Sequence, residues 1–144
     1  MKNLTFYLIL IILSACSNSS MQEVMDTDLA FSELSKSKGM NHAFLTYAHD
    51  SAVILRKNHR PVAGTTELQK LLSAPDSSFT LTWKPSYASM AQSGELAYTY
   101  GIYTLITVKQ DTSFGTYVTI WKKTAQGWRW VLDSGNAGLG TVNQ

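Results

Sequence analysis

The chain has 144 residues, of which 12 are basic and 10 acidic; its formal net charge is +2, and 44% of its residues are hydrophobic. This length suits one domain with a hydrophobic core, and the sparse charges of mixed sign, with no basic run, exclude a nucleic-acid-binding protein. The only cysteine, Cys16, excludes an internal disulfide and a cysteine-based metal cluster.

The N-terminal segment has the pattern of an export signal. Lys2 precedes an apolar run over residues 4–13. A run of about ten residues is too short to span a membrane, which needs about twenty, and is typical of a secretory signal peptide. The run ends in Leu13-Ser14-Ala15-Cys16, which resembles the bacterial lipobox. In that motif a peptidase cuts before the cysteine, and the thiol carries a diacylglycerol.

Processing at this motif would leave Cys16 as a lipidated N-terminus. We therefore expect a signal peptide over residues 1–15, a lipidated cysteine and tether over residues 16–27, and attachment to a membrane through the lipid. Ser17 is not acidic, which resembles the outer-membrane address of enteric lipoproteins. The predicted location is the bacterial cell envelope, at the outer membrane facing the periplasm.

Two helices, or one bent helix, are predicted after the tether. Apolar residues recur at helical spacing after Asp28, which with Thr27 is a candidate N-cap. Gly39 interrupts the pattern, and the apolar stripe then continues to Ala48. This stripe predicts helices that pack one face against a sheet.

The next segments predict a first strand over residues 52–55 and a short third helix that begins with the capping-box pattern Thr66-x-x-Gln69. After Pro75 the composition favours consecutive antiparallel strands joined by short turns, one of them broken near Pro85. These strands are predicted over residues 79–91, 96–108, 116–123 and 128–133.

Helices followed by a meander of strands indicate an α+β domain, predicted over residues 28–136. We expect a cone-shaped curved antiparallel sheet wrapped around two to three N-terminal helices. The open end of such a cone is a natural pocket for a small, largely apolar molecule. The glycine-rich residues 137–144 are predicted to form a flexible tail.

Several motifs, in this order along the chain, carry a resemblance to a known superfamily. The motifs are Lys38-Gly39-Met40-x-x-Ala43-Phe44, Trp83-x-Pro85, Ser93-Gly94-Glu95-Leu96-Ala97-Tyr98-Thr99-Tyr100-Gly101, Tyr117-x-Thr119-x-Trp121-Lys122-Lys123 and Gly127-Trp128-x-x-Val131-x-Asp133-x-Gly135. Together they resemble the nuclear transport factor 2-like superfamily, with its ketosteroid isomerase-like and SnoaL-like members, and within it the branch called domain of unknown function 4440. The resemblance implies a cone-shaped fold, an internal pocket and frequent homodimers through the sheet. It implies no single chemistry.

Asp133 is the first candidate for a functional residue. It follows an aromatic strand, where loss of solvation would raise its proton affinity. A carboxyl group of this kind can move a proton in a ketosteroid isomerase-like pocket. The alternative is a turn acceptor at the end of a strand.

The other candidates are aromatic residues and one acid. Tyr47 or Tyr103 could donate a hydrogen bond to a ligand, and Asp50, beside His49, could face the cone. The predicted ligand wall contains Trp83, Tyr100, Tyr117 and Trp121. Packing in the core or between strands is the alternative role for all these aromatic residues, and an exposed turn is the alternative place for Asp50.

No cofactor or metal site is predicted. His42 and His49 are two helical turns apart, too far to bind one ion, and no phosphate-binding or nucleophile motif is present. Three functions therefore stay open: a lipid-anchored ligand-binding protein, an enzyme that uses Asp133, and a dimeric envelope protein with a vestigial pocket.

Overall fold

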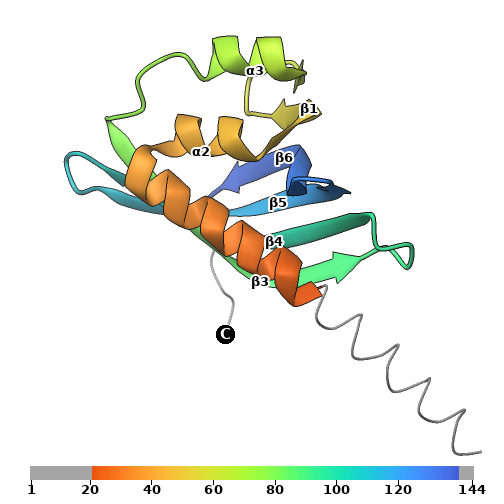
Figure 1. Cartoon of the computed structure of the whole chain (residues 1–144). Helices are drawn as coiled ribbons and strands as arrows, with labels where there is room; N and C mark the ends of the chain where they lie inside the picture. Colours follow the sequence, from red (N-terminus) through yellow and green to blue (C-terminus); the bar gives the residue numbers. More distant parts are fainter. Residues whose placement is uncertain (1–20, 140–144) are drawn as a thin grey trace, which may run out of the picture.

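The computed structural model describes residues 21–139. Cys16 and the predicted signal peptide lie outside the described residues, as do residues 140–144. The described part contains helices packed on one side of a curved six-stranded sheet (Figure 1). This arrangement confirms the predicted α+β fold.

The helical layer contains three helices within the described residues. The chain is helical over residues 21–38, then forms α2 (Met40–Tyr47) and, after the first strand, α3 (Thr65–Leu71). Residues 21–27 are therefore helical, although the tether was expected to extend through residue 27. Asp28 is not an N-cap either, because it lies within the helix and is fully buried.

Helix α2 begins after Gly39, whose φ of 91° is readily adopted only by glycine. The carboxylate of Asp76 accepts a hydrogen bond from the backbone N–H of Asn41 at 2.7 Å, at the start of α2. No side chain caps α3, which begins after Gly64; the capping box predicted at Thr66 does not form.

The sheet has the strand order β2-β1-β6-β5-β4-β3. The first and last strands in chain order, β1 and β6, are parallel neighbours, whereas all other neighbouring pairs in the sheet are antiparallel. The sheet is therefore mixed, which corrects the prediction of a purely antiparallel one. The strands are β1 (Ala48–Leu55), β2 (Val62–Ala63), β3 (Phe79–Met90), β4 (Leu96–Thr107), β5 (Thr112–Thr124) and β6 (Gly127–Ala137).

Strand β6 is longer than predicted, because Gly135 and Ala137 still pair with β5. The first part of the predicted tail is thus ordered strand. Along β3 the register shifts between Pro85 and Tyr87, which confirms the break predicted near Pro85.

The edge strand β3 is covered by the long helix. The hydroxyl of Ser32 accepts a hydrogen bond from the backbone N–H of Trp83 at 2.8 Å, and the hydroxyl of Ser35 donates one to the carbonyl of Leu81 at 2.6 Å. These serines satisfy backbone groups that an edge strand would otherwise leave unpaired.

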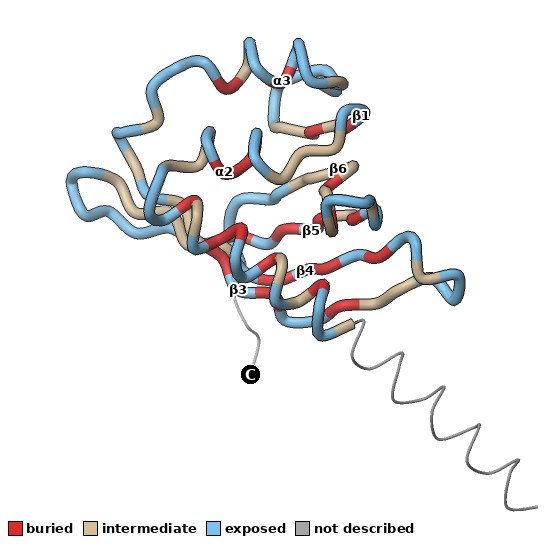
Figure 2. Tube along the Cα trace, in the orientation of Figure 1, coloured by how far each residue is buried: buried red, intermediate tan, exposed pale blue. Residues whose placement is uncertain are grey.

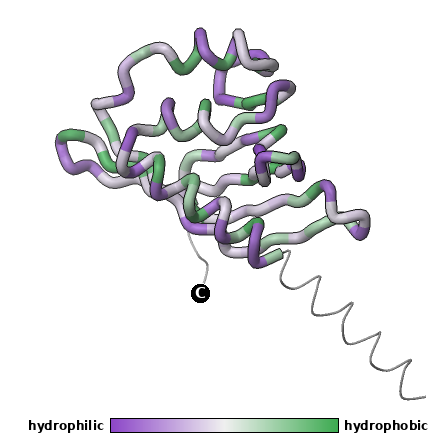
Figure 3. The backbone as a smooth tube through the Cα atoms, viewed as in Figure 1, coloured by the Kyte–Doolittle hydropathy of each residue, from purple (hydrophilic) through white to green (hydrophobic). Residues whose placement is uncertain are grey.

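The core between helices and sheet is rich in aromatic side chains. The ring of Phe31 lies 4.8 Å from that of Phe44 and 4.6 Å from that of Trp83, both in edge-to-face geometry. Trp121 and Trp130 are fully buried beneath them. The buried residues line the inner faces of helices and strands in Figure 2, and hydrophobic and hydrophilic residues alternate along both in Figure 3.

Candidate functional site

A cavity of about 720 Å³ opens between α2 and one end of the sheet. Its walls are mainly apolar, and its mouth is marked by exposed residues that include Lys57, His59 and Asn136. A small set of polar and charged side chains faces the same space. The apolar lining residues include Met40, Phe44, Ile54, Leu55, Leu81, Trp83, Leu105 and Ala137, and the other polar ones are Arg56, Tyr103, Tyr117, Asp133 and Ser134.

Asp133 reaches this cavity because of an irregularity in β6. Trp130 pairs with Trp121, but the next pair is Leu132 with Ile120, so one extra residue, Val131, is inserted. Strict alternation from Trp130 would point Asp133 to the opposite face of the sheet. The bulge changes the alternation and directs Asp133 to the inner face, as bulges commonly do.

The carboxyl group of Asp133 is poorly solvated. Burial raises its pKa from 3.8 to about 7, and the charge of Asp28 adds to the rise. Two groups oppose it: Thr119 donates a hydrogen bond from Oγ1 to Asp133 Oδ2 at 2.7 Å, and the cation of Arg56 lies nearby. Asp133 can therefore hold or release a proton near neutral pH.

A second carboxyl group, Asp28, lies behind the cavity wall. It is fully buried; its Oδ1 accepts a hydrogen bond from Trp83 Nε1 at 2.7 Å, and its Oδ2 accepts one from the hydroxyl of Tyr117 at 2.8 Å. Burial raises the pKa of Asp28. Burial and the neighbouring Asp28 also raise the pKa of Tyr117, which therefore stays a neutral phenol. Its only proton is given to Asp28, so Tyr117 offers the cavity an acceptor.

Tyr103 enters the cavity across a glycine. A Cβ atom at Gly115 would collide with the hydroxyl of Tyr103 and with the carbonyl oxygen of Asn136. Only glycine leaves room for this close approach of β4, β5 and β6. Gly115 thus allows the phenol of Tyr103 to lie along the cavity wall.

The structure brings together four of the residues predicted for the site: Trp83, Tyr103, Tyr117 and Asp133 all line the cavity. Four others lie elsewhere and do not line it. Tyr100 is on the outer face of β4 and is 46% exposed. Trp121 is fully buried in the core, and its indole N–H donates to Thr99.

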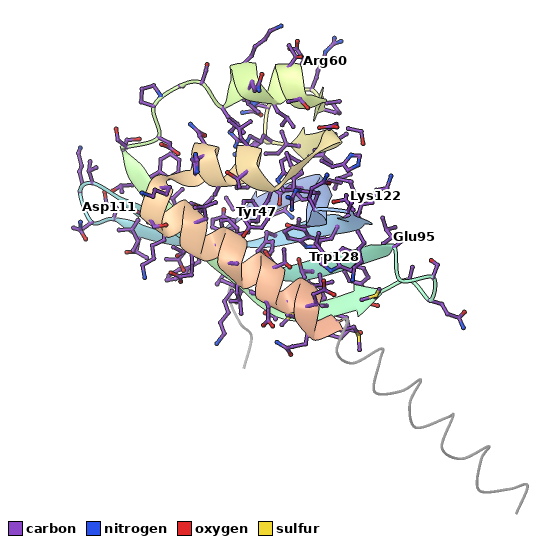
Figure 4. The ribbon with its side chains drawn as sticks, in the orientation of Figure 1. Tyr47, Arg60, Glu95, Asp111, Lys122 and Trp128 are labelled. Atoms are coloured by element: carbon purple, nitrogen blue, oxygen red, sulfur yellow. The ribbon has the colours of Figure 1, made fainter. Side chains whose placement is uncertain are left out.

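Tyr47 and Asp50 are the remaining two. The ring of Tyr47 packs between the long helix and the sheet, 5.1 Å from Phe31 and 6.5 Å from Trp121, as Figure 4 also shows. Asp50 is an exposed residue of β1, and its neighbour His49 shares a hydrogen bond with Ser51 at 2.9 Å. The prediction that these two face the pocket is therefore corrected.

Two charged residues of the site were not singled out from the sequence. Asp28 looked like a helix cap, because an acid at the start of an apolar periodicity usually is one. Arg56 follows a short apolar strand and resembled an ordinary surface residue. Val24 lies four residues before Asp28 and Phe31 three residues after it, so all three share one face of a helix. The two apolar residues were a usable signal that this acid lies on the inner face.

Within residues 21–139, no group of three potential metal-binding side chains lies close enough to hold an ion. In the same range no helix is both long and apolar enough to cross a lipid bilayer.

The chain has the fold of the nuclear transport factor 2-like proteins. A nuclear transport factor 2-like protein with a cystatin-like fold from Novosphingobium aromaticivorans matches it with a TM-score of 0.68 at 13% identity, over 98% of this chain and 92% of that one. A ketosteroid isomerase-like protein from Erwinia carotovora matches with a TM-score of 0.64 at 11% identity, over 82% and 95% of the two chains.

A third solved structure belongs to a Streptomyces avermitilis protein of the same fold that is provisionally described as a dehydratase. Its TM-score is 0.66 at 10% identity, over 86% of this chain and 99% of that one. No family model matches the sequence, and no curated protein matches it. At these identities the likeness defines the fold, whereas the function has to be argued from the site.

Proposed function

We propose that the chain is a lipid-anchored protein of the bacterial envelope whose cone binds a small, largely apolar molecule. The observation that supports this proposal is the cavity of about 720 Å³ behind α2. Pockets for small molecules commonly measure about 300–1,000 Å³ and combine apolar walls with a few polar groups. A vestigial pocket would instead be filled by its own side chains.

Binding can be tested with the neutral, apolar fluorophore N-phenyl-1-naphthylamine. We expect the chain from Ser17 onward, which contains every described residue, to bind it with an increase in fluorescence. Leu105 lines the cavity on β4, so Leu105→Trp should fill the space and weaken binding at least tenfold. Val108, which is 67% exposed just beyond β4, provides the control Val108→Trp. Equal binding by all three proteins would contradict the proposal.

A second candidate function is acid–base catalysis by Asp133, with Tyr103 as the hydrogen-bond donor. It is favoured by one observation: the pKa of Asp133, at the cavity wall, is raised to about 7. A structural relative is named ketosteroid isomerase-like. Incubation with 5-androstene-3,17-dione, followed by absorbance of the conjugated enone, tests this function. Faster isomerisation with the wild type than with Asp133→Asn supports it, and equal rates count against it.

The lipid anchor is tested separately, because Cys16 lies outside the described residues. The Cys16→Ala variant should lose both membrane fractionation and incorporation of a labelled fatty acid when it is expressed in bacteria. A single acyl chain holds a protein only marginally, whereas a diacylglyceryl group anchors it stably. If the variant still fractionates with membranes and takes up label, the lipoprotein proposal is wrong.

A further inference from the structure

Strand β1 directs an arginine into the cavity. Ile54 pairs with Asp133 of β6, and Leu55 pairs with Ser134. Arg56 follows directly, two residues after the buried Ile54 and beside the end of β6. It is half-buried and lines the cavity, whereas Lys57 and His59, which also line it, are exposed at the mouth.

Arg56 forms no ion pair with any acid in the part of the chain that the structure describes. The ion pairs within residues 21–139 are Glu67 with Lys70 and Glu23 with Lys123, and neither involves Arg56. Its guanidinium approaches the sulfur of Met40 at 3.9 Å, which is a weak contact. A cation that has lost part of its water and gained no counter-ion is unfavourable in an apolar cavity.

Asp133 compensates Arg56 only in part. Its charge opposes the fall that burial causes in the pKa of Arg56, but its Oδ2 atom is engaged by Thr119. The other ionisable groups around the cavity are Lys57 and His59, which are exposed at its mouth, and Tyr103 and Tyr117 in its wall. Asp28 lies behind the wall and already accepts two hydrogen bonds. Of the two cations that line the cavity, Arg56 is the half-buried one, whereas Lys57 is exposed at the mouth.

We infer that the cavity selects molecules that carry a carboxylate on an apolar body, and that Arg56 binds this carboxylate. The inference deepens the function proposed above and rests on it. A guanidinium presents two parallel N–H donors that match the two oxygens of a carboxylate. One half-buried arginine suits a monoanion. The apolar wall, which includes Phe44 and Leu105, suits a hydrocarbon or aromatic body.

The test compares two probes of nearly equal shape, 2-naphthylacetic acid and 2-naphthylacetamide. Calorimetric titrations at pH 6 keep the probe ionised, and Asp133 mostly protonated because its pKa is about 7. We expect the wild type to bind the acid at least tenfold more tightly than the amide. Arg56→Gln should abolish this preference, and Arg56→Lys should keep part of it. The control Lys109→Gln removes one exposed cation from the β4–β5 turn and should leave the preference unchanged.

Equal affinities for the acid and the amide in the wild type would overturn the inference, as would an unchanged preference in Arg56→Gln. So would failure of the wild type to bind the acid. A preference for 2-naphthyl phosphate over the acid would assign Arg56 to phosphate groups instead. Because N-phenyl-1-naphthylamine is uncharged, its binding reports on the proposed function independently. If thermal unfolding shows that Arg56→Gln does not fold, Arg56→Lys is used instead. A reduced preference of this variant for the acid over the amide would support the inference, and an unchanged preference would overturn it.

Discussion

Asp133 is a residue whose charge changes near neutral pH, because its pKa is raised to about 7. Its proton is retained in the folded chain because the carboxyl group is shielded from water and lies near a second acid, Asp28. The unfolded chain solvates the same group fully and gives it an ordinary pKa near 3.9. Folding therefore favours the protonated form of Asp133.

This linkage predicts how stability depends on pH. Since the folded pKa is about 7, the contribution of Asp133 to stability is present below pH 4 and is lost as the pH rises toward 7. The loss amounts to at most about 4 kcal/mol, and less after allowance for the partial exposure of the residue. Asp133→Asn keeps an acceptor for Thr119 and should flatten this dependence.

Urea unfolding at pH 5 and pH 8 measures the effect. We compare the free energy of unfolding of the variant with that of the wild type at each pH. We expect this difference to shift in favour of the variant by about 1–3 kcal/mol between pH 5 and pH 8. Asp50→Asn alters an exposed acid and is the matched control. Parallel pH profiles of the wild type and Asp133→Asn would contradict the assignment.

Single residues also show where sequence reasoning reaches its limit. The aromatic neighbours of Asp133 indicate a desolvated site, but the alternation of β6 alone would turn the side chain outward, because an inserted residue leaves no mark in the sequence. The regular alternation of β4 places Tyr98 and Tyr100 together on its outer face, so alternation was the signal against the prediction that Tyr100 belongs to the ligand wall. Arg56 could not be identified, because its neighbours come from β6, about 80 residues further along the chain.

Among the elements, β5 determines how closely its neighbours approach. Its inner face carries Gly115, Tyr117, Thr119 and Trp121, in order of increasing distance from the cavity mouth. Gly115 lies where Tyr103 crosses from β4, and Trp121 lies in the core. Gly115 at one end of this face and the fully buried Trp121 at the other leave the cavity at one end of the cone and fill the other end.

Gly115→Ala tests this arrangement. The added methyl group would meet backbone at Asn136 and the ring of Tyr103, neither of which is the end of a flexible chain. We expect a loss of about 1–3 kcal/mol in the free energy of unfolding and weaker binding of N-phenyl-1-naphthylamine. Thr116→Ala, at the adjacent exposed position, is the control. A stability equal to that of the wild type would show that the strands can move apart.

Elements were predicted more reliably than their arrangement. Periodicity placed the strands of the meander, because each packs one face on the core and exposes the other. The parallel pairing of β1 with β6 was missed, since no local pattern reports on partners so distant in the chain. The early start of the long helix was missed because the polar residues Gln22, Glu23, Asp26 and Thr27 resemble a tether until Val24 is known to be buried.

At the scale of the whole molecule, the outer face of the sheet carries a cluster of exposed apolar and aromatic residues. Tyr87, Tyr98, Tyr100 and Ile102 are each 41–48% exposed there, and the ring of Tyr87 lies 5.6 Å from that of Tyr100. A cluster of this kind favours contact with a second copy of the same face, because one two-fold axis would cover both. We propose a homodimer through this surface.

Light scattering at micromolar concentration should give the chain from Ser17 onward twice its monomer mass. Ile102→Glu places a charge at the centre of the outer face and should produce monomers with an unchanged thermal unfolding temperature. Leu45→Glu changes another exposed apolar residue, which lies on α2 away from this face, and should remain dimeric. A monomeric wild type would disprove the dimer.

The neighbourhood of β1 and β6 also has a consequence for the order of events during folding. Ile54 pairs with Asp133 although about 80 residues of chain separate them, so the cavity needs both β1 and β6. Contacts of such sequence separation form slowly, because a long loop must close first. Until β6 docks, β1 has only the two-residue β2 beside it. The last strand is thus both the wall that carries Asp133 and the segment that joins β1 to the meander.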